Sequence, residues 1–176
     1  MARIKVWNGS SWDYVGNEVS GAVTESGTQT LTNKTIEVGD NTITNKYKMR
    51  AYRNAALTLS GSGFKKITLD TENYDTNNNF ATGTYTVPVT GVYAISGAVG
   101  SSSASIFHSA IFVNGSMALQ GTYTGTSASA PYSNVVGDLL LTASDTVELY
   151  VYTSIAAQVI GLGSSDTYMS IRLVSR

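Results

Sequence analysis

The chain of 176 residues contains no cysteine, only two prolines and a single histidine, His108. The absence of cysteine excludes disulfide bonds, thiolate nucleophiles and cysteine-ligated zinc. A single histidine excludes a metal site built from several imidazoles. Because His108 lies in an apolar stretch, we expect its side chain to be packed or to lie at an interface. Charged residues make up only 13% of the chain, about half the usual share. No apolar run approaches the roughly 20 residues of a membrane span, so we expect no membrane insertion.

Basic residues are missing from most of the chain. Nine of the eleven lysines and arginines lie in residues 1–66, and none lies between Ile67 and Ile171. Because a nucleic-acid surface neutralises several phosphates with cations, we expect no nucleic-acid binding by the larger segment. Six basic residues could form a cationic collar, which we interpret as a solvated face or a contact with an acidic partner: Lys46, Lys48, Arg50, Arg53, Lys65 and Lys66.

The abundant residues indicate an all-β fold. Serine and threonine each occur 22 times, and tyrosine 11 times; these residues favour strands, turns and loops. Residues alternate between apolar and polar in Val147–Tyr152, and Ile106–Val113 is almost continuously apolar, as in a strand covered on both faces. About ten strands without a helix predict two packed antiparallel sheets, a sandwich or jelly roll, over residues 51–176. The expected strands are Leu57–Leu59, Phe64–Leu69, Gly83–Val87, Val92–Val99, Ile106–Val113, Met117–Tyr123, Ser133–Thr142, Thr146–Thr153, Gln158–Gly161 and Tyr168–Val174.

The first 50 residues have a different character. Residues 1–20 predict a β-hairpin, because Asn8-Gly9 is a strong turn signal between two short strand-like segments. Since an isolated hairpin is marginal in water, we expect it to attach to a partner through its aromatic residues Trp7, Trp12 and Tyr14. Residues 21–50 contain a repeat, Thr30–Lys34 and Thr42–Lys46. Such a polar repeat is either a flexible linker or a thin β or extended stem built from several chains.

The segment Thr82–Tyr93, with Gly83, Tyr85, Pro88 and Gly91 in order, resembles the signature of the globular-head family of the first complement component, which is related in fold to tumour necrosis factor. The likeness continues through an Asn114-Gly115 hairpin and Asp145–Leu149, and covers residues 55–176. Tyr168, Ser170 and Ser144 depart from the family pattern. The resemblance implies a ten-stranded jelly roll that forms tight trimers. We expect tyrosines to line the trimer interface, namely Tyr85, Tyr93, Tyr150, Tyr152 and Tyr168.

Two short segments near the N-terminus resemble virion proteins. Gly27–Ile36 is similar to a segment that recurs in bacteriophage tail fibres, and Val6–Trp12 is similar to the start of many small phage structural proteins. The first residues have no apolar stretch of the signal-peptide type. Together these features predict a homotrimeric phage fibre located in the virion, made in a host cytoplasm and released by lysis. The N-terminus would dock to other virion proteins, and the head would adhere to a host-surface glycan or protein.

No catalytic constellation is evident, so we expect a non-enzymatic protein without a cofactor. Ligand binding is expected in loops that contain Ser102, Ser103, Tyr123 and Tyr132, where aromatic rings among small hydroxyl residues suit sugar faces and equally suit a plain surface loop. Asp138, Asp145 and Asp166 are candidate calcium ligands if they gather near a threefold axis. Three alternatives stay open: a capsid head fibre or decoration protein, a polysaccharide depolymerase, and a bacterial complement-like adhesin.

Overall fold

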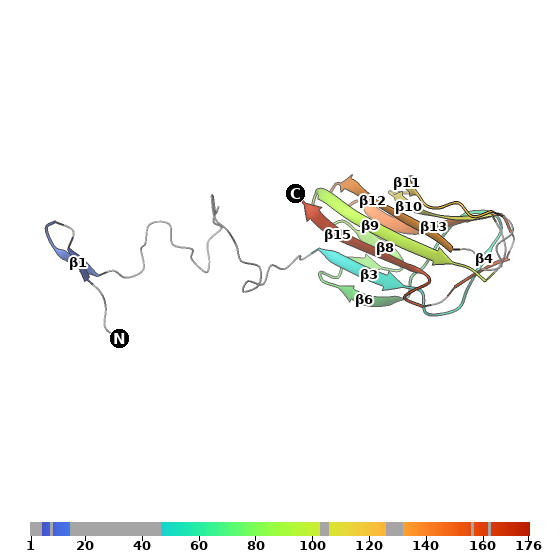
Figure 1. The fold of residues 1–176 in the computed structure, drawn as a ribbon, viewed down its shortest axis with the longest axis horizontal. Coiled ribbons are helices and arrows are strands. Elements are labelled where there is room, and N and C mark those ends of the chain that lie inside the picture. The colour runs from blue at the N-terminus through green and yellow to red at the C-terminus, as the bar shows by residue number, and fades with distance from the viewer. Residues whose placement is uncertain are drawn as a thin grey trace. The chain divides into compact units, whose positions relative to one another are not determined.

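The computed structural model describes residues 5–7, 9–14, 47–102, 106–125, 132–155, 157–161 and 163–176. It divides into two units, Met1–Ile43 and Thr44–Arg176 (Figure 1). In the first unit β1 (Lys5–Trp7) and β2 (Trp12–Tyr14) form an antiparallel hairpin with Trp7 opposite Trp12. The glycine of the turn, Gly9, has a positive φ of 97°, the conformation that makes Asn-Gly a hairpin signal. A hairpin is thus present at the expected turn, while residues 21–46 of the expected stem lie outside the described residues.

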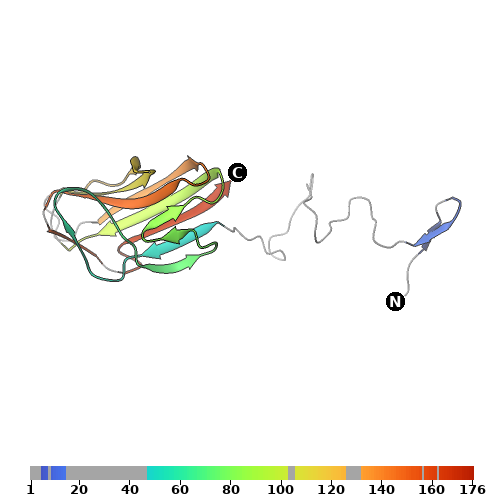
Figure 2. The same ribbon diagram turned by 180° about the vertical axis from the view of Figure 1, so that it is seen from behind.

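The second unit is a sandwich of two antiparallel sheets, which Figures 1 and 2 show from opposite sides. One sheet has five strands in the order β12-β9-β15-β3-β6. The other has six, in the order β11-β10-β13-β8-β7, with β5 also paired to β13. A separate pair, β4 with β14, completes the unit. The strands are β3 (Lys48–Tyr52), β4 (Leu57–Ser60), β5 (Gly63–Lys66), β6 (Thr71–Asp75), β7 (Phe80–Ala81), β8 (Thr84–Thr86), β9 (Gly91–Gly100), β10 (Phe107–Val113), β11 (Ser116–Gln120), β12 (Tyr132–Leu141), β13 (Thr146–Thr153), β14 (Ala157–Ile160) and β15 (Tyr168–Ser175).

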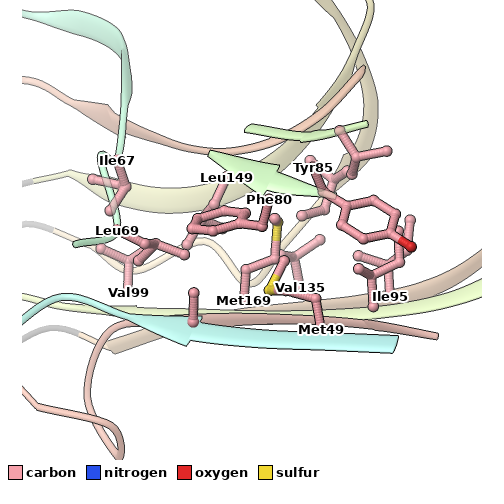
Figure 3. Close-up of a cluster of buried hydrophobic side chains, with 14 of the residues drawn as sticks. Met49, Ile67, Leu69, Phe80, Tyr85, Ile95, Val99, Val135, Leu149 and Met169 are labelled. Atoms are coloured by element: carbon pink, nitrogen blue, oxygen red, sulfur yellow. The ribbon is translucent and has the colours of Figure 1, made fainter. Parts of the chain in front are cut away.

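Alternation along the strands builds the core. On β13 the side chains of Val147, Leu149 and Val151 are buried between the sheets, and the residues between them are more exposed. Burial is continuous over Phe107–Ile111 at the start of β10, as its apolar run predicts. Figure 3 shows Leu149 in a layer with Met49, Met169 and other apolar side chains of both sheets. Burial of such side chains stabilises the fold by roughly 1.5–3 kcal/mol each.

Two tyrosines expected at a trimer interface belong to this core. Tyr85 on β8 and Tyr93 on β9 are both 0% exposed in the single chain, and Figure 3 shows Tyr85 inside the cluster. The prediction is wrong for these two residues, because their side chains face the opposite sheet and cannot line a surface. The error arises from treating tyrosine as an outward residue: on β9 Tyr93 points the same way as Ile95, at the alternate spacing of inward positions.

Only Thr146–Thr153 has the expected bounds; the other strands differ by one residue or more, and the main differences are as follows. The head begins at Lys48, within residues assigned to the stem, because Met49 and Ala51 of β3 are core residues. The expected strand Phe64–Leu69 stops at Lys66. The two strands β6 and β7 were not expected, since one is a polar segment and the other has only two residues. The sandwich therefore contains more strands than the ten that the resemblance implies.

Candidate functional site: an aromatic cluster on the six-stranded sheet

Six rings gather on the outer face of the six-stranded sheet, away from the core. We call them the aromatic cluster. Strand pairing sets them side by side, because Tyr152 of β13 lies opposite both Phe64 of β5 and His108 of β10. Each of these rings occupies the outward position of its pleat, on the face opposite inward residues such as Val151. The members of the cluster are Phe64, His108, Phe112, Tyr123, Tyr150 and Tyr152.

Phe64 holds the cluster together. Its ring lies edge-on to three others, with centroid distances of 5.3 Å to His108, 5.3 Å to Phe112 and 5.4 Å to Tyr152. Phe112 in turn stacks on Tyr150 at 4.0 Å. Edge-to-face and offset-stacked contacts of this kind each contribute about 0.5–1.5 kcal/mol beyond burial. The rings are therefore a preorganised surface, although Phe64 remains 36% exposed.

His108 lies between two tyrosines. Its ring stacks on Tyr152 at 5.0 Å on one side and on Tyr123 at 5.5 Å on the other. The residue is 7% exposed, and burial lowers the pKa of its imidazole below the ordinary value. Its Nδ1 atom is buried and has no hydrogen-bond partner among the described residues. The expectation of a packed histidine is confirmed, but one of its polar atoms is left unpaired.

The charges beside the cluster cancel. Lys66 Nζ lies 2.6 Å from Glu148 Oε1, and the hydroxyl of Thr84 donates to the same oxygen at 2.8 Å. Burial opposes ionisation of Glu148, but the hydrogen bonds from Lys66 and Thr84 outweigh it and lower the pKa of the carboxyl. Lys66 and Glu148 are the charged residues at outward positions of β5, β8, β10, β11 and β13. The face therefore presents aromatic and hydroxyl groups with no net charge.

The outer face of the five-stranded sheet is different in chemistry. On β12, an edge strand of that sheet, Val136 and Leu140 are each 78% exposed. A hollow of about 120 Å³ lies beside Val136, between small side chains such as Ala94 and Ser170. This surface is mixed, because Asp138 and Arg172 border the hollow beside the apolar Val136. Large apolar side chains exposed on an edge strand are a liability unless something covers them.

The three remaining interface tyrosines do not share one surface. Tyr150 and Tyr152 belong to the aromatic cluster, whereas Tyr168 lies on the five-stranded sheet, where the Arg50 guanidinium stacks over its ring at 3.9 Å. A single seam lined by all five tyrosines is therefore wrong. Among the expected ligand-loop residues, Tyr123 is 58% exposed and joins the cluster, whereas Tyr132 and Ser102 lie elsewhere and Ser103 is outside the described residues.

Tyr132 forms a smaller polar contact at the end of β12. Its phenol is hydrogen-bonded to the Asp166 carboxylate, and this bond, with burial and the carboxylate charge, raises the pKa of Tyr132. Tyr132 also packs against Gly100, where any side chain would meet the ring. The contact holds the ends of two strands together. Tyr132 and Tyr123 are thus separate features of the surface.

Within one chain, each of the three aspartates that are candidate calcium ligands has different neighbours. Asp145 accepts hydrogen bonds from the Asn114 side chain and the Thr142 amide, both at 2.7 Å, and so closes the turn between β12 and β13. Asp138 borders the hollow on β12, and Asp166 contacts Tyr132. In the part of the chain that the structure describes, no group of three or more His, Asp or Glu could hold a metal ion. The same part contains no helix with the length and hydrophobicity needed to cross a membrane.

The sequence indicates four of the six rings but not that they form one cluster. It points to Tyr123 in a loop, Tyr150 and Tyr152 at an interface and His108 as a packed side chain, whereas Phe64 and Phe112 carry no such indication. A signal was present: Phe64, His108, Phe112, Tyr150 and Tyr152 all occupy alternate positions opposite the core residues of their strands. What the sequence does not give is the pairing of β5 with β13, which brings Phe64 to the other rings.

Comparison with solved structures shows the fold. The chain is similar to the globular domain of zebrafish complement 1qA protein, with 17% identity and a TM-score of 0.57 over 74% of this chain and 99% of that chain. It is similar to murine APRIL, with 10% identity and a TM-score of 0.60 over 72% and 98%. It is also similar to Eiger TNF from S. frugiperda, with 10% identity and a TM-score of 0.58 over 73% and 92%. No family model and no curated protein matches the chain. The second unit is thus a two-sheet sandwich of the complement and tumour necrosis factor jelly-roll type.

Proposed function

We propose that the chain is a non-enzymatic, homotrimeric binding module of a bacteriophage fibre, whose head adheres to a host-surface glycan or protein. The N-terminal hairpin would dock to the virion and residues 21–50 would form the stem. The segments Val6–Trp12 and Gly27–Ile36 support the virion setting, because they resemble phage structural proteins. The fold supports a binding module, because loops and sheet faces on a rigid sandwich can present a ligand surface.

The observation that carries self-association is the exposure of Val136 and Leu140. Both lie on edge strand β12, and both are 78% exposed in the single chain. Full burial of each side chain would contribute roughly 1.5–3 kcal/mol. Copies of the chain that cover this edge of the sheet would bury both side chains and offset the absence of disulfides.

The test of assembly uses the full chain and two double-lysine comparisons. Light scattering should give a particle of three times the 18.6 kDa chain mass. Val136→Lys with Leu140→Lys should give the mass of one chain, because two charges would have to be buried at the interface. Tyr123→Lys with Phe64→Lys, in the aromatic cluster, should leave the trimer intact. A wild-type monomer, or a trimer that survives the β12 substitutions, would contradict this assignment.

The virion role has its own test. An antibody against the head should label intact particles of the phage that encodes the chain, seen by electron microscopy. Label at the tail would support a receptor-binding fibre, and label over the capsid would favour the decoration protein. Particles without any label would rule out both virion roles.

A further inference from the structure

The aromatic cluster has no structural task that requires its exposed rings. The core of the sandwich is complete without it, because inward residues such as Ile111, Leu149 and Val151 already fill the space between the sheets. Large apolar side chains gathered on an outer face are uncommon in soluble domains and mark interaction sites. Phe64, His108, Phe112, Tyr150 and Tyr152 lie on the six-stranded sheet, whereas Val136 and Leu140 lie on the five-stranded sheet. A trimer assembled through Val136 and Leu140 therefore does not require contact with these rings.

The electrostatics of the face limit the ligand class. Lys66 and Glu148 neutralise each other at 2.6 Å and are tied to Thr84. An anionic ligand would need an unpaired cation, and the pairing of Lys66 removes the one that this face offers. A cationic ligand would be favoured by an uncompensated carboxylate, and Lys66 compensates the one that this face offers, Glu148. The face thus suits a ligand without charge.

The Nδ1 atom of His108 favours a ligand that can form a hydrogen bond with it. The residue is more than nine-tenths buried within the cluster, and its Nδ1 has no partner among the described residues. Leaving such an atom unpaired is costly. A neutral imidazole nitrogen is either a donor or an acceptor, and a hydroxyl group can satisfy it in both cases because hydroxyls do both. A small shift of the exposed Tyr123 ring, which covers one side of the imidazole, would open a path to this atom.

We infer that the aromatic cluster is a binding site for a neutral saccharide, with the sugar ring against Tyr123 and Phe64 and a hydroxyl paired to His108. This inference rests on the proposed adhesive function and specifies its ligand and its location. A pyranose combines an apolar C–H face, which suits the electron-rich face of an aromatic ring, with hydroxyls around its edge. The site thus lies on a sheet face, apart from the Tyr132 contact at the end of β12.

The experiment probes the full-length protein on a glycan array that carries neutral oligosaccharides of glucose, galactose, mannose, rhamnose and their N-acetyl amino forms, together with sialylated and sulfated glycans. At least one neutral glycan should bind. Tyr123→Ala should weaken that binding by about tenfold or more, and Tyr123→Phe, which keeps the ring, should retain it. Tyr74→Ala is the matched control, because Tyr74 is a similarly exposed tyrosine on β6 of the other sheet.

Three results would overturn the inference: no neutral glycan bound at millimolar concentration, binding restricted to acidic glycans, or a Tyr123→Ala protein that binds as well as wild type. Thermal unfolding of each variant shows that the fold is intact, and Tyr123 is a safe position because its side chain is mostly exposed. Light scattering on the same samples separates the two proposals. A trimer that binds no sugar leaves the fibre assignment standing and removes only the saccharide site.

Discussion

Removal of the phenol hydroxyl should have opposite effects on the free energy of unfolding at two buried tyrosines. Tyr85 and Tyr93 are both fully buried in the core. The Tyr93 hydroxyl donates to the Val89 carbonyl at 2.8 Å. The Tyr85 hydroxyl is buried without a hydrogen-bond partner among the described residues, and burial, with smaller contributions from Tyr93 and Asp75, raises its pKa far above the ordinary value. Replacement of either tyrosine by phenylalanine removes one oxygen and leaves the ring in place.

The magnitudes follow from the two environments. Tyr93→Phe removes a hydrogen bond and leaves the Val89 carbonyl unpaired, so the free energy of unfolding should fall by about 1–2 kcal/mol. Tyr85→Phe removes a hydroxyl whose desolvation is not compensated, so the free energy of unfolding should rise by about 1 kcal/mol. The two variants should therefore differ by about 2–3 kcal/mol in spite of identical chemistry.

Urea denaturation measures the difference directly. At one fixed protein concentration, which matters for a chain that self-associates, the midpoint should move up for Tyr85→Phe and down for Tyr93→Phe, each by roughly 0.3–1 M, with similar slopes. If Tyr85→Phe destabilises the protein as much as Tyr93→Phe, the Tyr85 hydroxyl has a partner and the reasoning is refuted.

Three further substitutions test the packing and electrostatics. Gly121→Ala should lower the free energy of unfolding by at least about 2 kcal/mol in thermal unfolding, because its Cβ would collide with the Ser109 side chain; a change under 0.5 kcal/mol would contradict the close approach. Because the folded-state pKa of Glu148 lies below its ordinary 4.5, the Lys66 pair stabilises the protein above that pH and is lost as pH falls through the lowered pKa, so the deficit of Glu148→Gln should shrink in acid. Because the folded-state pKa of His108 lies below 6.5, wild type should lose stability as pH falls from 6.5, and His108→Gln should lose less over the same range.

Local patterns predicted the strands that carry strong alternation or a clear turn. The alternation of Val147–Tyr152 marks β13, and Asn114-Gly115 marks the turn before β11, where both residues have positive φ. The polar strand Thr71–Asp75 lacked such a signal, since its place at the edge of the five-stranded sheet requires no buried stripe. Strands with strong alternation or a clear turn are therefore readable from sequence, the edge strands β11 and β12 among them, and short polar strands are not.

The candidate site was less predictable because it depends on pairing between distant strands. Phe64 and Tyr152 are 88 residues apart in the chain and meet through the register of β5 on β13. The direction of a tyrosine was also misjudged: Tyr85 and Tyr93 fit a surface seam by composition, but their places in the alternation of β8 and β9 put them in the core. The residue types indicate an aromatic surface, but the strand register determines whether each ring lies in the core or on the outer face.

A crystal or cryo-EM structure of the full chain tests the central claim most directly. The account predicts three copies in which Val136 and Leu140 are buried against neighbouring protomers while Phe64 and Tyr123 remain open to solvent. A protomer whose β12 side chains contact no other copy, or an assembly closed through the aromatic rings, would contradict it.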